Sequence, residues 1–230
     1  MKRLAYIPAR GGSKGIPKKN IAEIGDMPLI AFTIVAALKS GLFDKVMVST
    51  DSDEIAEVAR LYGAWVPFLR YAEFAQDTSR TIDAVISDKT RLEEMGEHFD
   101  ELVLLQCTSP FRTAKDIQGA VALAEKVHAG VVSISPVEEH PILMRTVDAN
   151  GRVSRVLNCS STCRRQDMPP YYRVNGAIYI NFWNELSPDL SLADNPYGYV
   201  MERKDSLDID TKADLHAAQV KLAKYSGVIK

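Results

Sequence analysis

In the first 136 residues, short apolar runs alternate with segments of helical periodicity. The apolar runs predict buried strands at residues 4–7, 45–50, 65–68, 102–105 and 130–134. Between them, apolar residues spaced along one helix face predict helices at residues 28–40, 51–62, 79–95 and 113–128. Strands that alternate with helices are typical of a parallel sheet. We therefore expect an α/β fold with a doubly wound, mostly parallel sheet.

Polar residues mark the ends of these helices. Gly41 follows the first helical segment and predicts its end. Asp51 is expected to cap the second helix, with Glu54 as an acid in its first turn. Thr113 and Asp116 have the spacing of a capping box at the start of the fourth helix.

The alternation stops after residue 136. Two short segments, residues 142–147 and 152–157, flank the sequence D-A-N-G at 148–151, and Asn-Gly is a strong signal for a hairpin turn. A polar stretch follows at residues 159–173. Because a two-stranded hairpin is not stable alone, we expect residues 137–173 to leave the sheet and form a dimerisation excursion against a second subunit.

The α/β pattern returns near the end of the chain. Residues 177–180 predict another buried strand. Thr211 and Asp214 provide a capping box for a C-terminal helix after residues 206–210. We expect residues 1–136 and 174–230 to form one α/β domain.

The length suits either one α/β domain or a domain with a modest appendage, and the hydrophobic content is ordinary for a globular protein. The 230 residues are 46% hydrophobic and carry a formal net charge of −2, so the bulk charge predicts no attraction to nucleic acid or membranes. The N-terminal apolar run is too short for a signal peptide, and no stretch is long enough to span a membrane. The three cysteines are expected to be reduced thiols of a cytoplasmic protein.

The loop after the first strand concentrates groups that bind anions. Its three glycines and four cations are Gly11, Gly12, Gly15, Arg10, Lys14, Lys18 and Lys19. Glycines let backbone N–H groups approach a ligand closely, and clustered N–H groups with cations form a site for phosphate. The alternative is a glycine-rich turn whose lysines are only solvated.

Two common glycine motifs do not fit this loop. A P-loop places its lysine after the second glycine, whereas Lys14 precedes Gly15 and Pro17 interrupts an early helix. The glycine spacing also differs from the G-x-G-x-x-G of dinucleotide-binding proteins. The long basic loop instead resembles the signature loop of nucleotidyltransferases, which wraps a nucleoside triphosphate.

Paired carboxylates predict a metal site. Asp208 and Asp210 are two residues apart, so on an extended segment both side chains point to one face while Ile209 points into a core. Mg²⁺ binds one or two carboxylates together with substrate phosphates. The alternative is that these acids only favour the following helix N-terminus.

Further polar residues are candidates for substrate binding. Gln106, Thr108 and Ser109 follow the most apolar strand, where they could also satisfy backbone groups of a turn. Arginine binds carboxylates and phosphates bidentately, and the excursion contains Arg164, Arg165 and Arg173. We assign His140 a structural role, and no nucleophile–histidine–acid triad is recognisable.

Seven segments in order resemble the CMP-sialic acid synthetases, and together they span nearly the whole chain. They are I-P-A-R-G-G-S-K-G-I-P-K-K-N, V-S-T-D-S-D-E-I-A, L-R with A-Q-D-T, L-L-Q-C-T-S-P-F-R-T, R-R-Q-D-M-P, N-G-A-I-Y-I and S-L-D-I-D-T. The resemblance implies transfer of CMP from CTP to the C2 hydroxyl of a nine-carbon 2-keto sugar acid, with release of pyrophosphate. It also implies a cytoplasmic homodimer that uses Mg²⁺.

The resemblance assigns a role to each matching residue. Those matching triphosphate-binding positions are Arg10, Ser13, Lys14, Lys19 and Asn20. Those matching positions around the cytosine and ribose are Arg70, Ser79 and Thr81. Those matching the sugar site are Gln106, Arg165 and Tyr179, and the metal-binding pair matches Asp208 and Asp210. The residues expected to act in catalysis are Lys19, Arg10 and Asp210.

Two departures leave the exact sugar open. Cys107 replaces a proline that the family often has, and the H-P-L-K of many N-acetylneuraminate enzymes is here His140-Pro141-Ile142-Leu143, with Arg145 as a possible substitute cation. N-acetylneuraminate and legionaminic acid both remain candidates. The competing interpretations are a cytidylyltransferase for the eight-carbon acid KDO and a non-catalytic nucleotide-binding regulator on the same fold.

Overall fold

A six-stranded sheet in the order β10-β6-β9-β5-β1-β4 forms the centre of the molecule. The computed structural model describes residues 1–159, 162, 164 and 168–227. The strands are β1 (Arg3–Pro8), β4 (Lys45–Ser49), β5 (Glu101–Leu105), β6 (Val131–Pro136), β9 (Tyr172–Phe182) and β10 (Tyr197–Val200). Only β9 runs antiparallel to its neighbours, β5 and β6. The expected doubly wound, mostly parallel sheet is confirmed.

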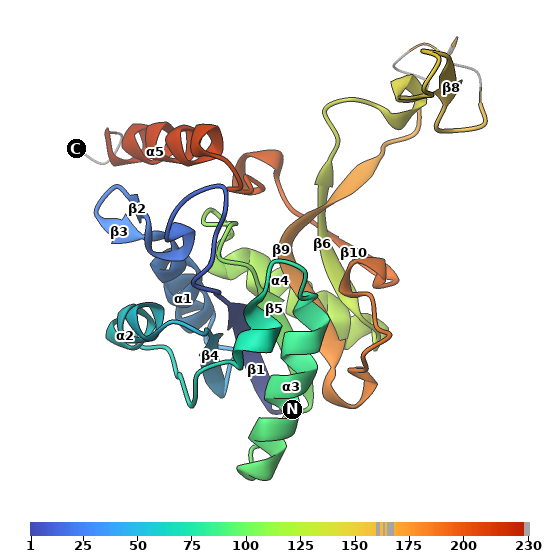
Figure 1. Ribbon diagram of the computed structural model, residues 1–230. Helices are drawn as coiled ribbons and strands as arrows, with labels where there is room; N and C mark the ends of the chain where they lie inside the picture. The colour runs from blue at the N-terminus through green and yellow to red at the C-terminus, as the bar shows by residue number, and fades with distance from the viewer. Residues whose placement is uncertain (160–161, 163, 165–167, 228–230) are drawn as a thin grey trace.

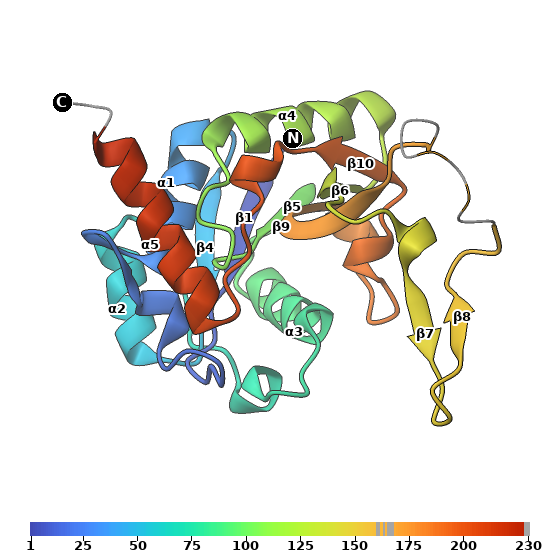
Figure 2. The ribbon, with the colours of Figure 1, turned by 90° about the horizontal axis from the view of Figure 1, so that it is seen from above.

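Helices cover both faces of this sheet (Figures 1 and 2). One face packs against α1 (Leu29–Ser40), α2 (Asp53–Leu61) and α4 (Ala114–Val127), and the other against α3 (Thr81–Glu94). Within β1, Leu4 and Tyr6 pack in the hydrophobic core on the α3 side of the sheet. Ala5 and Ile7 pack in the core on the side of α1, α2 and α4. A strand buried on both faces explains why this segment is a continuous apolar run.

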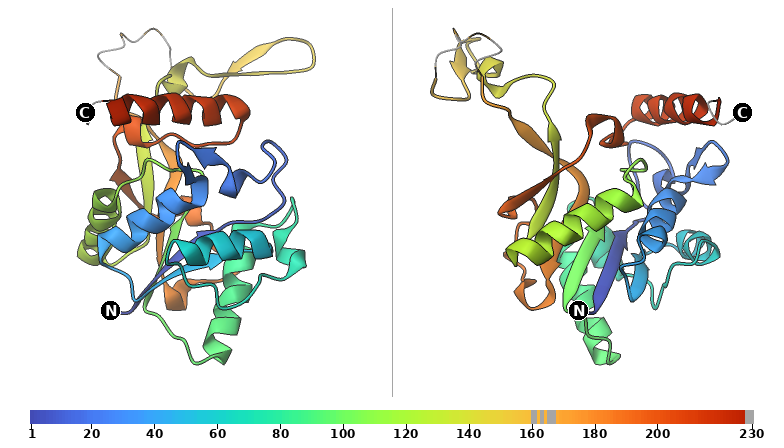
Figure 3. Two further views of the ribbon diagram at one scale, coloured as in Figure 1. Left: turned by 90° about the vertical axis from the view of Figure 1, so that its left-hand side faces the viewer. Right: turned by 180° about the vertical axis from the view of Figure 1, so that it is seen from behind.

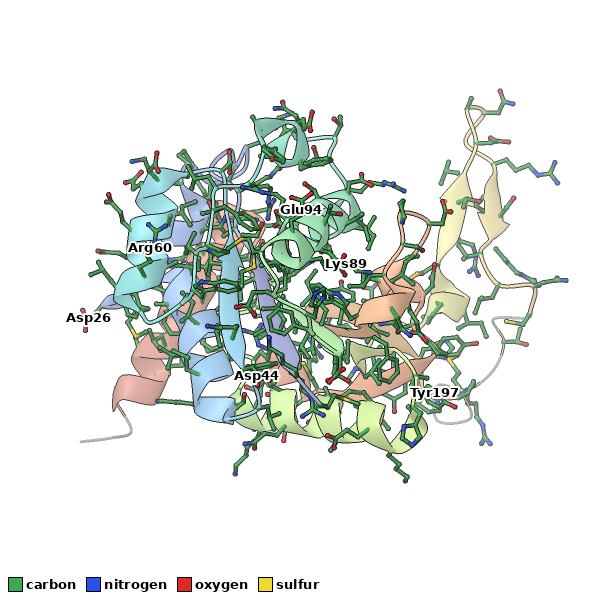
Figure 4. All side chains as sticks on the ribbon, turned by 90° about the horizontal axis from the view of Figure 1, so that it is seen from below. Asp26, Asp44, Arg60, Lys89, Glu94 and Tyr197 are labelled. Carbon is green, nitrogen blue, oxygen red and sulfur yellow. The ribbon has the colours of Figure 1, made fainter. Side chains whose placement is uncertain are left out.

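The segment that follows β9 closes the face of the sheet next to α3. The ring of Trp183 packs against the ring of Phe99, with 5.4 Å between the two ring centroids. The ammonium group of Lys89 on α3 reaches this segment and donates to the Trp183 carbonyl at 2.8 Å (Figure 4).

Most predicted helix boundaries are confirmed, and one is wrong. Gly41 ends α1 in the left-handed conformation, and Thr113 with Asp116 forms the expected capping box of α4. The cap of α2 is Ser52, whose hydroxyl accepts from the backbone N–H of Ile55. Asp51 does not cap this helix because its carboxylate accepts from the backbone N–H of Gly11 at 2.8 Å.

Several short elements differ from the prediction. Residues 65–68 do not form a strand, since only Trp65 makes a single bridge, to Met47. The small hairpin of β2 (Glu23–Ile24) and β3 (Met27–Pro28) was not expected. Neither was the largely exposed edge strand β10.

The predicted hairpin is present and projects from the sheet as an arm (Figures 1 and 2). It consists of β7 (Arg145–Val147) paired with β8 (Val153–Arg155). A bulge in the pairing of β6 with β9 lies near Gly176, which has a φ of 79°. Bulges bend a strand, and on the arm side of this bulge residues 172–174 of β9 stay paired with β6 but not with β5.

The C-terminal helix α5 (Lys212–Gly227) has the capping pair that the sequence predicts. Thr211 and Asp214 exchange side-chain and backbone hydrogen bonds at its start. Helix α5 and the arm both lie on the side of the sheet opposite the N-terminus (Figure 3). Within the described residues, no helix is both long and apolar enough to cross a membrane.

Candidate active site

A cleft of about 420 Å³ lies at the carboxyl ends of the parallel strands. This is the edge at which α/β folds bind ligands. Ten of the residues predicted from the sequence line it: Arg10, Ser13, Lys14, Lys19, Asn20, Arg70, Ser79, Thr81, Gln106 and Asp210. They come from segments far apart in the chain, so the fold brings the basic loop, the loops after β4 and β5, and the carboxylate segment together.

The basic loop packs directly on the carboxylate segment. The Lys19 ammonium donates at 3.0 Å to the Ile209 carbonyl and at 3.0 Å to the Asp210 carboxylate. A Cβ atom on Gly15 would lie 2.6 Å from the Asp210 carbonyl oxygen, so only glycine permits this approach. Ile16 and Ile209 share a small buried cluster beneath the two segments, which fixes the position of the cations relative to the carboxylates.

Arg10 and Lys14 converge on a residue that sequence reasoning missed. The Asp77 carboxylate pairs with Lys14 at 2.6 Å and with Arg10 at 3.0 Å. The hydrogen bond from Lys14 is the main cause that lowers the pKa of Asp77. Asn20 supports the arrangement by donating to the Arg10 carbonyl at 2.9 Å. The carboxylate of Asp77 is therefore paired with two of the cations that the sequence assigns to phosphate binding.

Ser79 lies just before α3 but does not cap this helix. Its hydroxyl accepts from Gln76 N–H at 3.1 Å and donates to the Glu73 carbonyl at 2.8 Å, whereas Arg80 is the residue before α3. Ser79 therefore orders the turn that carries Asp77 past the cleft.

Asp208 and Asp210 differ in environment. Asp208 is partly buried and its Oδ1 has no hydrogen-bond partner, whereas the Asp210 side chain is 70% exposed. Burial raises the pKa of Asp208, opposed by a hydrogen bond from Thr108. Ile209 between them is fully buried, and its N–H donates to the Thr108 carbonyl at 2.9 Å.

This pair fits the requirements of Mg²⁺. Within the described part of the chain, no cluster of three or more histidine, cysteine or acidic side chains could hold a metal. Two carboxylates are nevertheless enough when substrate phosphates complete the coordination. The unpartnered, buried oxygen of Asp208 is a polar atom that needs such a partner.

Gln106 connects the cleft to two adjoining pockets. One pocket of about 210 Å³ is lined by Gln106, Arg173, Tyr179 and Asp208. The other pocket, of about 420 Å³, also contains Gln106 and Tyr179, together with apolar side chains that include Leu190 and Leu192. Burial raises the pKa of Tyr179, so this phenol stays neutral.

The remaining arginine candidates have different outcomes. Arg165, expected in the sugar site, lies outside the described residues. Arg173 reaches the smaller of the two pockets. Arg145 lies on the arm and donates to the Ile142 and Met144 carbonyls at 2.8 and 2.7 Å.

A second residue missed by sequence reasoning is Arg112. Its side chain is buried, and Nη1 donates at 3.2 Å to the carbonyls of both Gln106 and Ala177. Burial lowers the pKa of Arg112 to about 10, so it remains charged near pH 7. Arg112 thereby joins the end of β5 to β9 directly behind the Gln106 side chain.

The fold is similar to that of two solved structures. It resembles a CMP:2-keto-3-deoxy-manno-octonic acid synthetase solved with CTP, with a TM-score of 0.74 over 98% of this chain and 100% of that one. A 4-diphosphocytidyl-2C-methyl-D-erythritol synthase from Anaerococcus prevotii gives 0.66 over 96% and 98%. The sequence identities are 17% and 13%, so these likenesses establish the fold alone.

The sequence identifies the family: the chain belongs to the cytidylyltransferases, whose family model matches residues 4–176. It is 39% identical to a CMP-N,N'-diacetyllegionaminic acid synthase of Legionella pneumophila over 93% of both chains. Identity is 38% with an N-acylneuraminate cytidylyltransferase of Streptococcus agalactiae over 93% of this chain and 52% of that protein, about half its length. A pseudaminic acid cytidylyltransferase of Campylobacter jejuni is 33% identical over 96% of both.

Proposed function

We propose that the protein transfers CMP from CTP to the C2 hydroxyl of a nine-carbon 2-keto sugar acid. The hydroxyl oxygen gives up its proton and forms a bond to the α-phosphorus, the bond from that phosphorus to the bridging oxygen breaks, and pyrophosphate leaves with the electron pair of that bond. One observation carries the proposal: the basic loop and Asp210 line the same cleft. This cleft adjoins two further pockets at Gln106. The names of the cytidylyltransferase relatives support the same reaction.

The basic loop would hold the triphosphate. Lys19 and Arg10 would neutralise charge as pyrophosphate leaves, since phosphoryl transfer depends mainly on positioning and electrostatic stabilisation. Ser13, Lys14 and Asn20 line the same cleft and would contact the phosphates or support the loop. The nucleoside would lie toward Arg70, Ser79 and Thr81, on the loops after β4 and before α3.

Asp208 and Asp210 would hold Mg²⁺. When bound, this ion would neutralise charge on the phosphates. Asp210, held by Lys19, lines the cleft, and Asp208, anchored by the Thr108 hydroxyl, lines the smaller adjoining pocket. The ion would bind between these two carboxylates.

The acceptor would occupy the pockets beyond Gln106. Gln106 and Tyr179 supply hydrogen-bonding groups, and Arg173 supplies a cation for the sugar carboxylate; Arg165 is a further candidate. The larger pocket offers Leu190 and Leu192 to apolar parts of the acceptor. We favour an acceptor of the legionaminic type, with acylamino groups and a deoxygenated end, over N-acetylneuraminate.

We further propose that the protein is a homodimer in which residues 137–173 form the dimerisation excursion and the rest of the chain forms the nucleotide-binding domain. The arm exposes large apolar side chains, with Leu143 61%, Val147 66% and Val153 61% exposed. Such residues on a projecting hairpin need a packing partner. The free thiols of Cys107 and Cys159 suit a cytoplasmic location.

Pyrophosphate release from CTP tests the function. The acceptors are N,N'-diacetyllegionaminic acid, N-acetylneuraminate, pseudaminic acid and KDO, and kcat/KM is measured for each. We expect the first to be used best and KDO at least about tenfold less well, since an unpaired buried group costs about 1–3 kcal/mol. A preference for KDO would support that alternative. Nucleotide binding without turnover of any acceptor would support a non-catalytic regulator.

A further inference from the structure

A buried carboxylate behind the cleft has no assigned role in the reaction above. Asp88 lies on α3 and is 0% exposed. Its Oδ2 accepts from the Tyr6 hydroxyl at 2.8 Å and from the Ser49 hydroxyl. A carboxylate buried among neutral donors is costly, so a positive charge is needed nearby.

Arg70 and Arg91 both supply such charge, and of the two Arg70 lies on the far side of Ser49 and lines the cleft. The Ser49 hydroxyl donates to Asp88 and accepts from Nε of Arg70 at 2.9 Å. The Ser49 carbonyl accepts from Nη2 of Arg70 at 2.8 Å. Because the hydroxyl proton is directed toward the carboxylate, an oxygen lone pair remains for the guanidinium.

The two bonds to Ser49 fix the plane of the guanidinium. The Arg70 backbone N–H also donates to the Thr50 carbonyl at 2.7 Å. Arg70 is only 8% exposed, yet it lines the cleft. Within the described residues, Nη1 of Arg70 donates no hydrogen bond, whereas Nε and Nη2 both donate to Ser49. Nη1 is therefore the nitrogen left to donate to an acceptor oxygen in the cleft.

Electrostatics connect Asp88 and Arg70 although they do not touch. Burial raises the pKa of Asp88, and the hydrogen bonds from Ser49 and Tyr6 and the charge of Arg70 act in the opposite direction. Loss of the carboxylate charge would leave the buried part of Arg70 uncompensated, with a Ser49 hydroxyl free to rotate. A chain of carboxylate, hydroxyl and guanidinium thus links the interior of α3 to the cleft.

We propose that Asp88 is a positioning residue that acts through Ser49 to hold Arg70 in the orientation that receives the nucleotide. The proposal rests on CTP being the nucleotide of the proposed function. A purely structural role, in which Asp88 only satisfies Tyr6 and Ser49, would instead affect stability without selectively weakening nucleotide binding.

The test measures the Kd for CTP by calorimetry in Asp88→Asn, Ser49→Ala and Arg70→Met. Asp88→Asn and Ser49→Ala should each weaken CTP binding about tenfold, the effect of losing one charge-assisted hydrogen bond. In Asp88→Asn and Ser49→Ala at saturating CTP, kcat and the KM for the sugar acid should stay within about twofold of the wild-type values. Tyr6→Phe is the matched control, because it removes the other donor to Asp88: it should lower Tm and leave the Kd for CTP unchanged.

A double-mutant cycle separates action through Arg70 from a general loss of structure. In the Arg70→Met background, Asp88→Asn should weaken CTP binding by less than about twofold. Full additivity of the two changes, or an unchanged Kd in the single variant, would overturn the proposal. If Asp88→Asn does not fold, Asp88→Ser takes its place in this cycle, because a cycle of Ser49 with Arg70 would not involve Asp88. A wild type that binds CTP without transferring CMP would overturn the proposed function while leaving these Kd values decisive for Asp88.

Discussion

The ammonium group of Lys19 donates at 3.0 Å to Asp210, which lies 191 residues further along the chain. Lys19 is also held by the Ile209 carbonyl at 3.0 Å, and its side chain is only 16% exposed. The position of this cation therefore depends on the main chain of the carboxylate segment as well as on one carboxylate. The basic loop and the carboxylate segment are thus held together. Substitutions in the loop and in the segment can nevertheless be tested one at a time.

Lys19→Ala should lower kcat/KM for CTP by about 10²-fold, because an electrostatic contact to the transferred phosphates is lost. Steady-state pyrophosphate release is the measurement. Lys18→Ala is the matched control: Lys18 pairs with Glu54 at 2.7 Å and its side chain is 67% exposed. We expect the control to change kcat/KM by less than about threefold. Equal losses in both variants would contradict a specific role for Lys19.

Asp210→Asn should lower kcat by about 10²-fold while the protein remains folded, since one proposed Mg²⁺ ligand loses its charge. Turnover is measured across a range of Mg²⁺ concentrations, with Tm as the check on folding. Asp214→Asn provides the comparison, because this nearby carboxylate caps α5 at the Thr211 N–H. It should lower stability by about 1 kcal/mol and preserve turnover. Wild-type rates in Asp210→Asn would remove Asp210 from the metal site.

Asp77→Asn should tighten CTP binding about two- to fivefold. Incoming phosphate must displace Asp77 from Lys14 and Arg10, and solvent-exposed ion pairs of this kind are weak, so the expected gain in affinity is small. Calorimetry gives the Kd. The control is Glu97→Gln, which removes a carboxylate paired with Lys2 at 2.9 Å, outside the lining of the cleft. Weaker binding in Asp77→Asn would show that Asp77 supports the nucleotide site instead of competing for it.

Val147→Lys on the arm should produce monomers and reduce activity. Val147 lies directly opposite Val153 in the hairpin, and both are largely exposed, so a charge there would be buried in the proposed interface. Light scattering at micromolar concentration gives the assembly state. Thr146→Lys, on the other face of the same strand, is the control and should leave the assembly unchanged. A wild-type monomer with full activity would exclude the dimer.

Cys107 should resist thiol reagents at pH 8. Burial raises the pKa of Cys107 to about 12, so at pH 8 its thiol is almost entirely neutral and lacks the thiolate that reacts. Cys159 is exposed and should react readily. Peptide mass spectrometry after iodoacetamide treatment measures both. Rapid labelling of Cys107 in the folded protein would contradict the buried environment.

The main sheet could be predicted because its strands are buried on both faces and read as apolar runs. The failures have local causes. Pro67 interrupts residues 65–68, leaving Trp65 with one bridge. Strand β10 is only four residues long, Y-G-Y-V, and its glycine and its exposure at the sheet edge make it differ from a buried apolar run.

The candidate site was predictable where its residues are close in sequence. The basic loop and the pair Asp208 and Asp210 each form a recognisable local pattern. Asp77, Asp88 and Arg112 matter through contacts with residues distant in the chain. No spacing rule in a single sequence reports such contacts, so only the folded arrangement reveals them.

The bulge in β9 has a consequence for how relatives of this protein can exchange parts. One continuous strand carries Arg173 toward the arm and Tyr179 in the sheet, with Gly176 between them. Recombination after Ser133 of β6 and at Gly176 would transplant the arm together with Arg173 and its β6 partner Ser135, and would leave Tyr179 and its β5 pairing untouched. A junction elsewhere in β9 would separate Arg173 from the arm or divide the residues that pair with β5. The bulge is therefore the place at which chimaeras between cytidylyltransferases should be joined.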